Sequence, residues 1–223
     1  GSTSRHAKRR NRRIGGGLIH EKGILLVLSG PSGAGKGTIC KYLLAHNPSL
    51  KYSISATTRA PRTGELDGQS YHFVSKDTFQ EMIAQDELLE HAEVYGNYYG
   101  TPKNYVQKLL DENLDVILEI DPQGAMQIKN KFPEAVFVLI LPPSLTELSD
   151  RIYKRGTDTA EVIRHRLSKA VSELKFCASK YDYLVINDEV NKASDKILAI
   201  ITSEKCRVGR NMPVVEEIIC NNN

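Results

Sequence analysis

The 223-residue sequence predicts an α/β fold in which helices cover both faces of a parallel sheet. Two observations support this prediction. Short, continuously apolar runs alternate with longer segments of helical pattern, and a glycine-rich turn directly follows the first apolar run. Runs without polar interruptions are typical of strands that are buried on both faces. None approaches the roughly 18 apolar residues that a membrane-spanning helix needs, so no membrane partner is expected.

The expected elements follow the chain in a regular order. The first strand is expected at residues 24–29, and the glycine-rich turn at 30–37 leads into a helical pattern. Further strands are expected at residues 116–120, 136–141 and 183–186. Helices are expected near residues 122–131, 144–155, 159–178 and 190–204. Because helices separate the strands, a parallel sheet is expected.

Residues 52–101 interrupt that alternation. The segment is polar, rich in Thr, Tyr and Gly, and contains short alternating runs such as 71–74. One helix is expected to start within it, at Ser75 or Asp77. We interpret the segment as a small mixed α+β lobe, inserted into a core formed by residues 23–51 and 102–207. Residues 208–223 are expected to form a C-terminal tail.

The first 22 residues are basic and are expected to form a disordered tail. The first four, Gly-Ser-Thr-Ser, have the composition of an expression-tag remnant, and residues 5–13 carry six lysines or arginines and no acid. The whole chain has a formal charge of +3, so the remainder without these six cations is at −3. A slightly acidic body is not typical of a protein that coats nucleic acid, and no specific nucleic-acid partner is expected.

The four cysteines are scattered along the chain, at positions 40, 177, 206 and 220. They form no Cys-x-x-Cys pair and have no metal-ligand spacing. This pattern indicates free thiols in a reducing compartment, so a cytoplasmic location is expected.

A P-loop pattern stands between the first strand and the first helix. Its glycines allow backbone N–H groups to surround phosphate oxygens, the helix N-terminus adds partial positive charge, and Lys36 supplies a full charge for the β- and γ-phosphates. The residue after the lysine is Gly37, where a hydroxyl residue is usual, so Mg²⁺ is expected to be held through nucleotide phosphates and water, with Thr38 as a candidate ligand. The nucleotide-binding residues of the loop are expected to be Gly30, Pro31, Ser32, Gly33, Ala34, Gly35, Lys36, Gly37 and Thr38.

Five motifs occur in order along the chain: GPSGAGKGT, SATTRAPR, GNYYGT, ILEIDPQG and RGTD. Through them the sequence resembles guanylate kinases over about residues 23–203, which is nearly the whole body. The resemblance implies a P-loop kinase core with an acceptor-binding lobe and a lid at about residues 151–166. It also implies transfer of the γ-phosphoryl group of ATP to GMP, with ATP and Mg²⁺ as cofactors and no covalent enzyme intermediate.

The resemblance assigns the acceptor nucleotide to the inserted lobe. Its phosphate would be held by Arg59, Arg62, Tyr71 and Tyr99, and its guanine would be recognised by Ser55, Glu90, Thr101 and Asp121. The chemistry agrees, because a carboxylate can accept from guanine N1 and N2 while a hydroxyl donates to O6. Adenine presents the opposite pattern, and each buried polar group left unpaired would cost about 1–3 kcal/mol.

The resemblance also assigns residues to the donor side. A transferring phosphoryl group spreads negative charge over its oxygens, and cationic side chains neutralise that charge. The catalytic residues would be Lys36, Arg59, Arg151, Arg155 and Arg166. Asn187, at the end of the last strand, would contact the adenine of ATP.

Two alternatives remain from the sequence. One is a monophosphate kinase for AMP or a pyrimidine nucleotide, which Glu90 and Thr101 argue against. The other is a catalytically inactive guanylate kinase-like domain that binds a protein partner. Such domains typically lack an intact glycine-rich loop and its lysine, whereas Gly35 and Lys36 are both present here.

Overall fold

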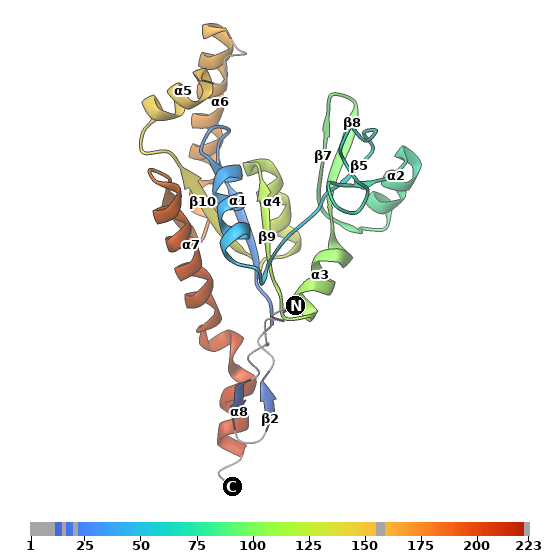
Figure 1. The fold of residues 1–223 in the computed structure, drawn as a ribbon, viewed down its shortest axis with the longest axis vertical. Helices are drawn as coiled ribbons and strands as arrows, with labels where there is room; N and C mark the ends of the chain where they lie inside the picture. Colours follow the sequence, from blue (N-terminus) through green and yellow to red (C-terminus); the bar gives the residue numbers. More distant parts are fainter. Residues whose placement is uncertain (1–11, 15–16, 20–21, 155–158, 221–223) are drawn as a thin grey trace, which may run out of the picture.

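The computed structural model describes residues 12–14, 17–19, 22–154 and 159–220. Its centre is a five-stranded sheet of order β11-β10-β3-β9-β4 in which every pair of neighbours is parallel (Figure 1). The strands are β3 (Leu25–Ser29), β4 (Leu50–Tyr52), β9 (Asp115–Ile120), β10 (Val136–Leu141) and β11 (Tyr183–Ile186). The parallel α/β fold class predicted from the sequence is therefore confirmed.

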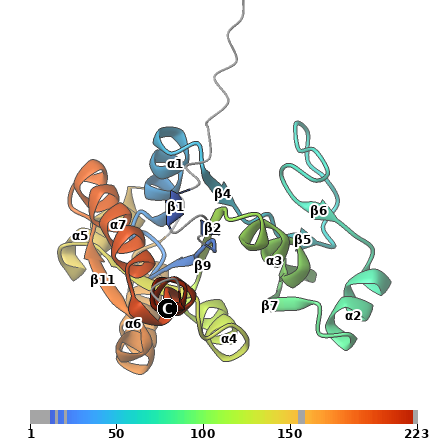
Figure 2. The same cartoon turned by 90° about the horizontal axis from the view of Figure 1, so that it is seen from below.

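Both faces of this sheet are buried beneath helices, as Figure 2 shows from below. Side chains alternate between the faces of a strand. Leu26 and Leu28 of β3 therefore belong to one apolar cluster, whereas Leu25 and Val27 belong to another. The first cluster includes residues of α1 (Lys36–His46) and α7 (Val190–Lys205), and the second includes residues of α3 (Lys103–Asp111) and α4 (Pro122–Lys131).

A second, smaller sheet stands beside the core in Figure 1. Its order is β6-β5-β8-β7, and only the β5–β6 pair is parallel. The strands are β5 (Ala56–Thr57), β6 (His72–Phe73), β7 (Leu88–Val94) and β8 (Asn97–Pro102). Helix α2 (Lys76–Ala84) begins after Ser75, whose hydroxyl accepts the Thr78 N–H, and its buried Phe79 packs among apolar residues of this sheet. The mixed lobe thus has its own small core.

Two further helices form a pair that projects beyond the core sheet in Figure 1. They are α5 (Leu145–Tyr153) and α6 (Ala160–Cys177), and they pack through Leu148, Ile152 and Ile163. Helix α5 ends two residues before the end expected from the sequence. Among the described residues, no helix is long and apolar enough to cross a bilayer.

The two ends of the chain contain short elements that the sequence did not predict. Within residues 1–22, expected to be disordered, β1 (Arg12–Ile14) and β2 (Gly17–Ile19) pair as antiparallel strands. Their isoleucines and leucine favour strands, a preference that the arginine-rich composition obscured. After η1 (Ala178–Lys180), β11 and α7, the C-terminal segment contains η2 (Val208–Arg210) and α8 (Met212–Cys220). Residues 1–11, 15–16, 20–21 and 221–223 of the two tails lie outside the described ranges.

Candidate active site

The P-loop connects the carboxyl end of β3 to the N-terminus of α1, at the edge of the sheet where α/β proteins bind their ligands. Two of its glycines are required by geometry. Gly35 has φ +88°, a left-handed conformation that side chains disfavour. At Gly30, a Cβ atom would lie 2.2 Å from the Ile140 carbonyl oxygen of the neighbouring strand. Among the described residues, no side chain caps the N-terminus of α1, and the partial positive charge of this helix end faces the loop.

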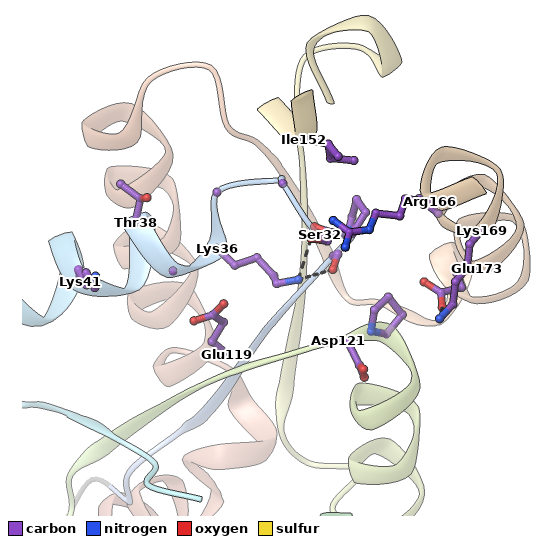
Figure 3. A pocket seen from close by; sticks show the side chains of 17 residues that line it. Ser32, Lys36, Thr38, Lys41, Glu119, Asp121, Ile152, Arg166, Lys169 and Glu173 are labelled. Carbon is purple, nitrogen blue, oxygen red and sulfur yellow. Dashed lines mark hydrogen bonds and ion pairs between the residues drawn. The ribbon is translucent and has the colours of Figure 1, made fainter. Parts of the chain in front are cut away.

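The lysine of the loop lies across the loop itself. The ammonium group of Lys36 donates to the Gly30 carbonyl and, at 3.5 Å, to the Pro31 carbonyl (Figure 3). These bonds hold the cation against the loop, in the lining of the cavity, where it is expected to meet a phosphate.

The loop opens on a cavity of about 550 Å³. Of the residues predicted to bind phosphate, eight from the loop and Arg166 line it. Figure 3 shows Arg166 pointing from α6 into this space. Asp121, predicted to contact guanine, also lines it. The predicted residues in the lining are Gly30, Pro31, Ser32, Gly33, Gly35, Lys36, Gly37, Thr38, Arg166 and Asp121.

Four charged residues of the cavity were missed by the sequence interpretation: Lys41, Glu119, Lys169 and Glu173. The last two follow Arg166 on α6 at spacings of three and seven residues, which places them on one helix face. That spacing could have identified them. Glu119 lies within the ILEID motif at the end of β9, so its position at the carboxyl edge of a buried strand was also a readable signal.

The lobe carries a buried acidic group. Glu90 on β7 is only 8% exposed, and its Oε1 accepts a hydrogen bond of 2.8 Å from the hydroxyl of Thr101, a fully buried residue on β8. Burial, together with the nearby negative charge of Asp121, raises the pKa of Glu90 from its ordinary 4.5 to about 7. The structure thus brings together two predicted guanine contacts that are 11 residues apart.

A second group on the lobe gathers around Arg59. Its guanidinium pairs bidentately with Glu65 at 2.8 and 2.9 Å and lies 5.3 Å from the centre of the Tyr71 ring. The Tyr71 and Tyr99 rings meet edge to face at 6.1 Å. The Arg62 N–H also donates to Glu65, at 2.7 Å. These bonds hold the pKa of the Glu65 carboxyl down to about 2.

Glu65 was not predicted from the sequence. It lies in the GELDGQS segment, and nothing in its spacing shows that it pairs with an arginine six residues earlier. The predicted phosphate contacts Arg59, Tyr71 and Tyr99 do lie together, with Arg62 exposed beside them. Ser55 directly precedes β5 on the same sheet. None of these lobe residues is among the described residues that line the P-loop cavity.

Comparison with known proteins identifies the family, because residues 22–204 match the family model described as guanylate kinase. The chain belongs to the guanylate kinase family. The guanylate kinase of Caldanaerobacter subterraneus subsp. tengcongensis is 58% identical over 193 residues, covering 86% of this chain and 93% of that protein. The guanylate kinase of Desulfitobacterium hafniense is 55% identical, covering 88% and 98% respectively. The crystal structure of guanylate kinase from Anaplasma phagocytophilum, at 33% identity, covers 89% of this chain and 94% of its own with a TM-score of 0.67.

As a guanylate kinase, the protein is a phosphotransferase that acts on a nucleoside monophosphate. Two residues predicted on its donor side contact the P-loop from outside the cavity lining. Arg151 donates to the carbonyls of Ala34, at 3.3 Å, and Asn187, at 2.9 Å. The amide of Asn187 also donates to the Ala34 carbonyl, at 2.9 Å, and its buried Oδ1 has no hydrogen-bond partner among the described residues. Both side chains therefore support the loop of this guanylate kinase, and their contacts with ATP stay predictions. Arg155 lies outside the described residues.

Asp121 occupies a position between the two parts of the guanylate kinase site. Its carboxylate accepts the Gly124 N–H at 2.8 Å and caps the N-terminus of α4. It lines the P-loop cavity, yet its charge also acts on Glu90 in the lobe. Its predicted contact with guanine stays a prediction, and helix capping alone accounts for its orientation.

Proposed function

We propose that this guanylate kinase transfers the γ-phosphoryl group of ATP directly to the phosphate of GMP, with ATP in the P-loop cavity and GMP on the lobe. The observation that carries this proposal is the buried pair of Glu90 and Thr101, 2.8 Å apart. An ionised carboxylate only accepts hydrogen bonds, so it matches the two donors of guanine. Adenine would place an acceptor against it, at a cost of about 1–3 kcal/mol for each unpaired buried group.

The cationic side chains suit direct transfer. Lys36 and the N-terminus of α1 would hold the β- and γ-phosphates of ATP, and Arg166 would reach them from α6. Arg59, already oriented by Glu65, would hold the GMP phosphate together with Arg62, Tyr71 and Tyr99. An oxygen of that phosphate is already an anionic nucleophile, so no general base is needed. Catalysis would come from positioning and from neutralisation of charge.

The oxygen ligands of the cavity fit Mg²⁺, which prefers carboxylates, hydroxyls and water. Thr38, Glu119 and Asp121 line the same space. The Glu119 carboxylate lies 3.5 Å from the place that a Cβ on Gly37 would occupy, so it stands directly beside the loop. We assign these three residues to hold a hydrated Mg²⁺ next to the ATP phosphates. The bound ion would neutralise phosphate charge.

Transfer requires the two nucleotides to meet, whereas the lobe residues lie outside the described lining of the P-loop cavity. We therefore propose that the lobe and the α5–α6 pair close when both nucleotides bind, which would also exclude water. We further propose a cytoplasmic location, because all four cysteines are free thiols.

A coupled assay for ADP release tests the proposed reaction. ATP and Mg²⁺ are supplied with GMP, AMP, CMP or UMP in parallel, and we expect ADP release with GMP alone. Lys36→Met should lower kcat by at least about 100-fold, because it removes a charge that acts on the transferring group. The exposed Lys192→Met on α7 is the matched control and should leave kcat unchanged. Equal activity with AMP would contradict the role of Glu90, and no activity with any acceptor would favour the inactive protein-binding alternative.

A further inference from the structure

Strand β7 joins the lobe to the core. It is an edge strand of the lobe sheet, because among the described strands it pairs with β8 alone, and its free edge faces α4 of the core (Figure 2). An edge strand exposes backbone N–H and C=O groups that need other partners. The side chains of α4 supply those partners.

Gln127 on α4 takes the place of a missing neighbouring strand. Its Oε1 accepts from the His91 N–H at 3.1 Å, and its Nε2 donates to the His91 carbonyl at 3.2 Å. A side-chain amide carries one acceptor and a donor, as a peptide unit does, so Gln127 satisfies both backbone groups of His91 at once. The two residues are 36 positions apart in the chain.

Two neighbouring contacts tie the same strand to the core. Lys131, one turn further along α4, donates to the Leu88 carbonyl at 2.9 Å and pairs with Asp86 at 2.7 Å. The register of β7 and β8 shifts between Leu88 and Glu90, which leaves Leu89 as the extra residue of a bulge. Leu89 is completely buried in the core cluster that contains residues of α4.

These contacts place Glu90 between two anchored residues. Leu89 is held in the core on one side, and the backbone of His91 is held by Gln127 on the other. The phosphate-binding candidate Arg59 instead follows β5, which is separated from β7 by β8. The Glu90 carboxylate, proposed to recognise guanine, is therefore fixed to the core by the residues on either side of it. Arg59, proposed to bind phosphate, lies instead on the outer part of the lobe.

We propose that Gln127 is a positioning residue for guanine recognition, which holds Glu90 in place on the core through the backbone of His91. This inference rests on the proposed role of Glu90 in binding GMP. Gln127 touches neither nucleotide in this scheme. Its effect is to limit the freedom of the carboxylate, so that the hydrogen bonds to guanine form without first ordering β7.

The variant Gln127→Met tests the proposal, because methionine has nearly the same volume and can form neither bond to His91. The KM values for GMP, for IMP and for ATP, and kcat with each acceptor, are measured with the purified full chain. IMP lacks the 2-amino group of guanine, so the ratio of kcat/KM for GMP over IMP reports on the alignment of Glu90. We expect KM for GMP to rise about tenfold and the ratio to fall, with KM for ATP unchanged.

Asn130→Met on the exposed face of the same helix is the matched control and should leave all constants unchanged. Gln127→Glu is a second variant that keeps the acceptor for the His91 N–H and loses the donor, so its effect should lie between wild type and Gln127→Met. Faster hydrogen exchange of the His91 amide should accompany the loss of selectivity.

An unchanged ratio for GMP over IMP in both variants would overturn the inference, and so would a rise in KM for ATP equal to that for GMP. Should Gln127→Met fail to fold, Gln127→Glu decides the matter by the same ratio. The outcome is separate from that of the proposed function. If the wild type releases no GMP-dependent ADP, the proposed function fails first, whereas an active wild type with insensitive Gln127 variants refutes the positioning role alone.

Discussion

Replacing Glu90 by glutamine should stabilise the ligand-free protein at pH 8 while weakening its binding of GMP. The carboxyl group is buried, and its folded-state pKa of about 7 lies above its ordinary value of 4.5. A carboxyl group whose pKa is higher in the folded state than in the unfolded state contributes its full stabilisation only at pH values below the pKa of the unfolded state. That contribution is lost as the pH rises through the window from about 4.5 to about 7.

The size of the effect follows from the two pKa values. The difference between 4.5 and about 7 corresponds to about 3 kcal/mol of unfolding free energy lost by pH 8. Glutamine does not ionise, so it avoids this loss, but its amide places a buried donor without a partner at a cost of about 1 kcal/mol. The variant should therefore be more stable than wild type by about 2 kcal/mol at pH 8, and about equal to it at pH 5.

Thermal unfolding followed by circular dichroism from pH 5 to pH 8 measures this difference. For a chain of this length, about 2 kcal/mol corresponds to a Tm increase of about 4–8 °C at pH 8. The exposed Glu93→Gln on the same strand is the control, and its Tm difference from wild type should not depend on pH. A Tm difference for Glu90→Gln that is the same at pH 5 and pH 8 would refute the reasoning. Added GMP should reverse the order, because only the carboxylate accepts both guanine donors.

Two further predictions concern the P-loop and the ion pair between Arg59 and Glu65. Gly35→Ala should raise KM for ATP and lower stability by about 1–2 kcal/mol, because the residue has φ +88° and its new Cβ would lie 2.3 Å from the Asn187 amide nitrogen. Gly96→Ala, at φ +79° with open space around it, should lower stability alone, and a normal KM for ATP in Gly35→Ala would contradict the geometry. Glu65→Ala should raise KM for GMP about two- to tenfold in the same coupled assay, because the phosphate must then order Arg59. A lower KM would instead mean that Glu65 competes with the phosphate.

The fold was predictable wherever it produced a local pattern. Strands β3, β9 and β10 are largely buried on both faces and therefore appear as continuous apolar runs. Strand β11 at the sheet edge also has an apolar run, although Leu184 and Ile186 are exposed. Strand β4 was missed because only Leu50 of its three residues is buried, so no such run forms. Helix α3 was missed although its apolar face is regular, since its nine residues directly follow the irregular lobe.

The candidate site was predictable to the extent that its motifs are local. The P-loop is a continuous segment, and the residues predicted from it line one cavity, apart from Ala34, which is buried with its carbonyl turned to Asn187. Their contacts with a nucleotide stay a prediction. Glu65 and Gln127 carry no such signal. Their significance arises from contacts with Arg59 and His91 that depend on how separate segments pack.

The sequence by itself determined the alternation of the main strands and helices of the core, the position of the glycine-rich loop and a first set of charged candidates for nucleotide binding. Each of these follows from local periodicity or from backbone sterics at a few adjacent positions. Only the tertiary structure decided the environment of those charges. It buried Glu90 and raised its pKa, and it anchored β7 to α4 through an amide 36 residues away. Burial and long-range pairing are properties of packed segments, so they exist only once the chain has folded.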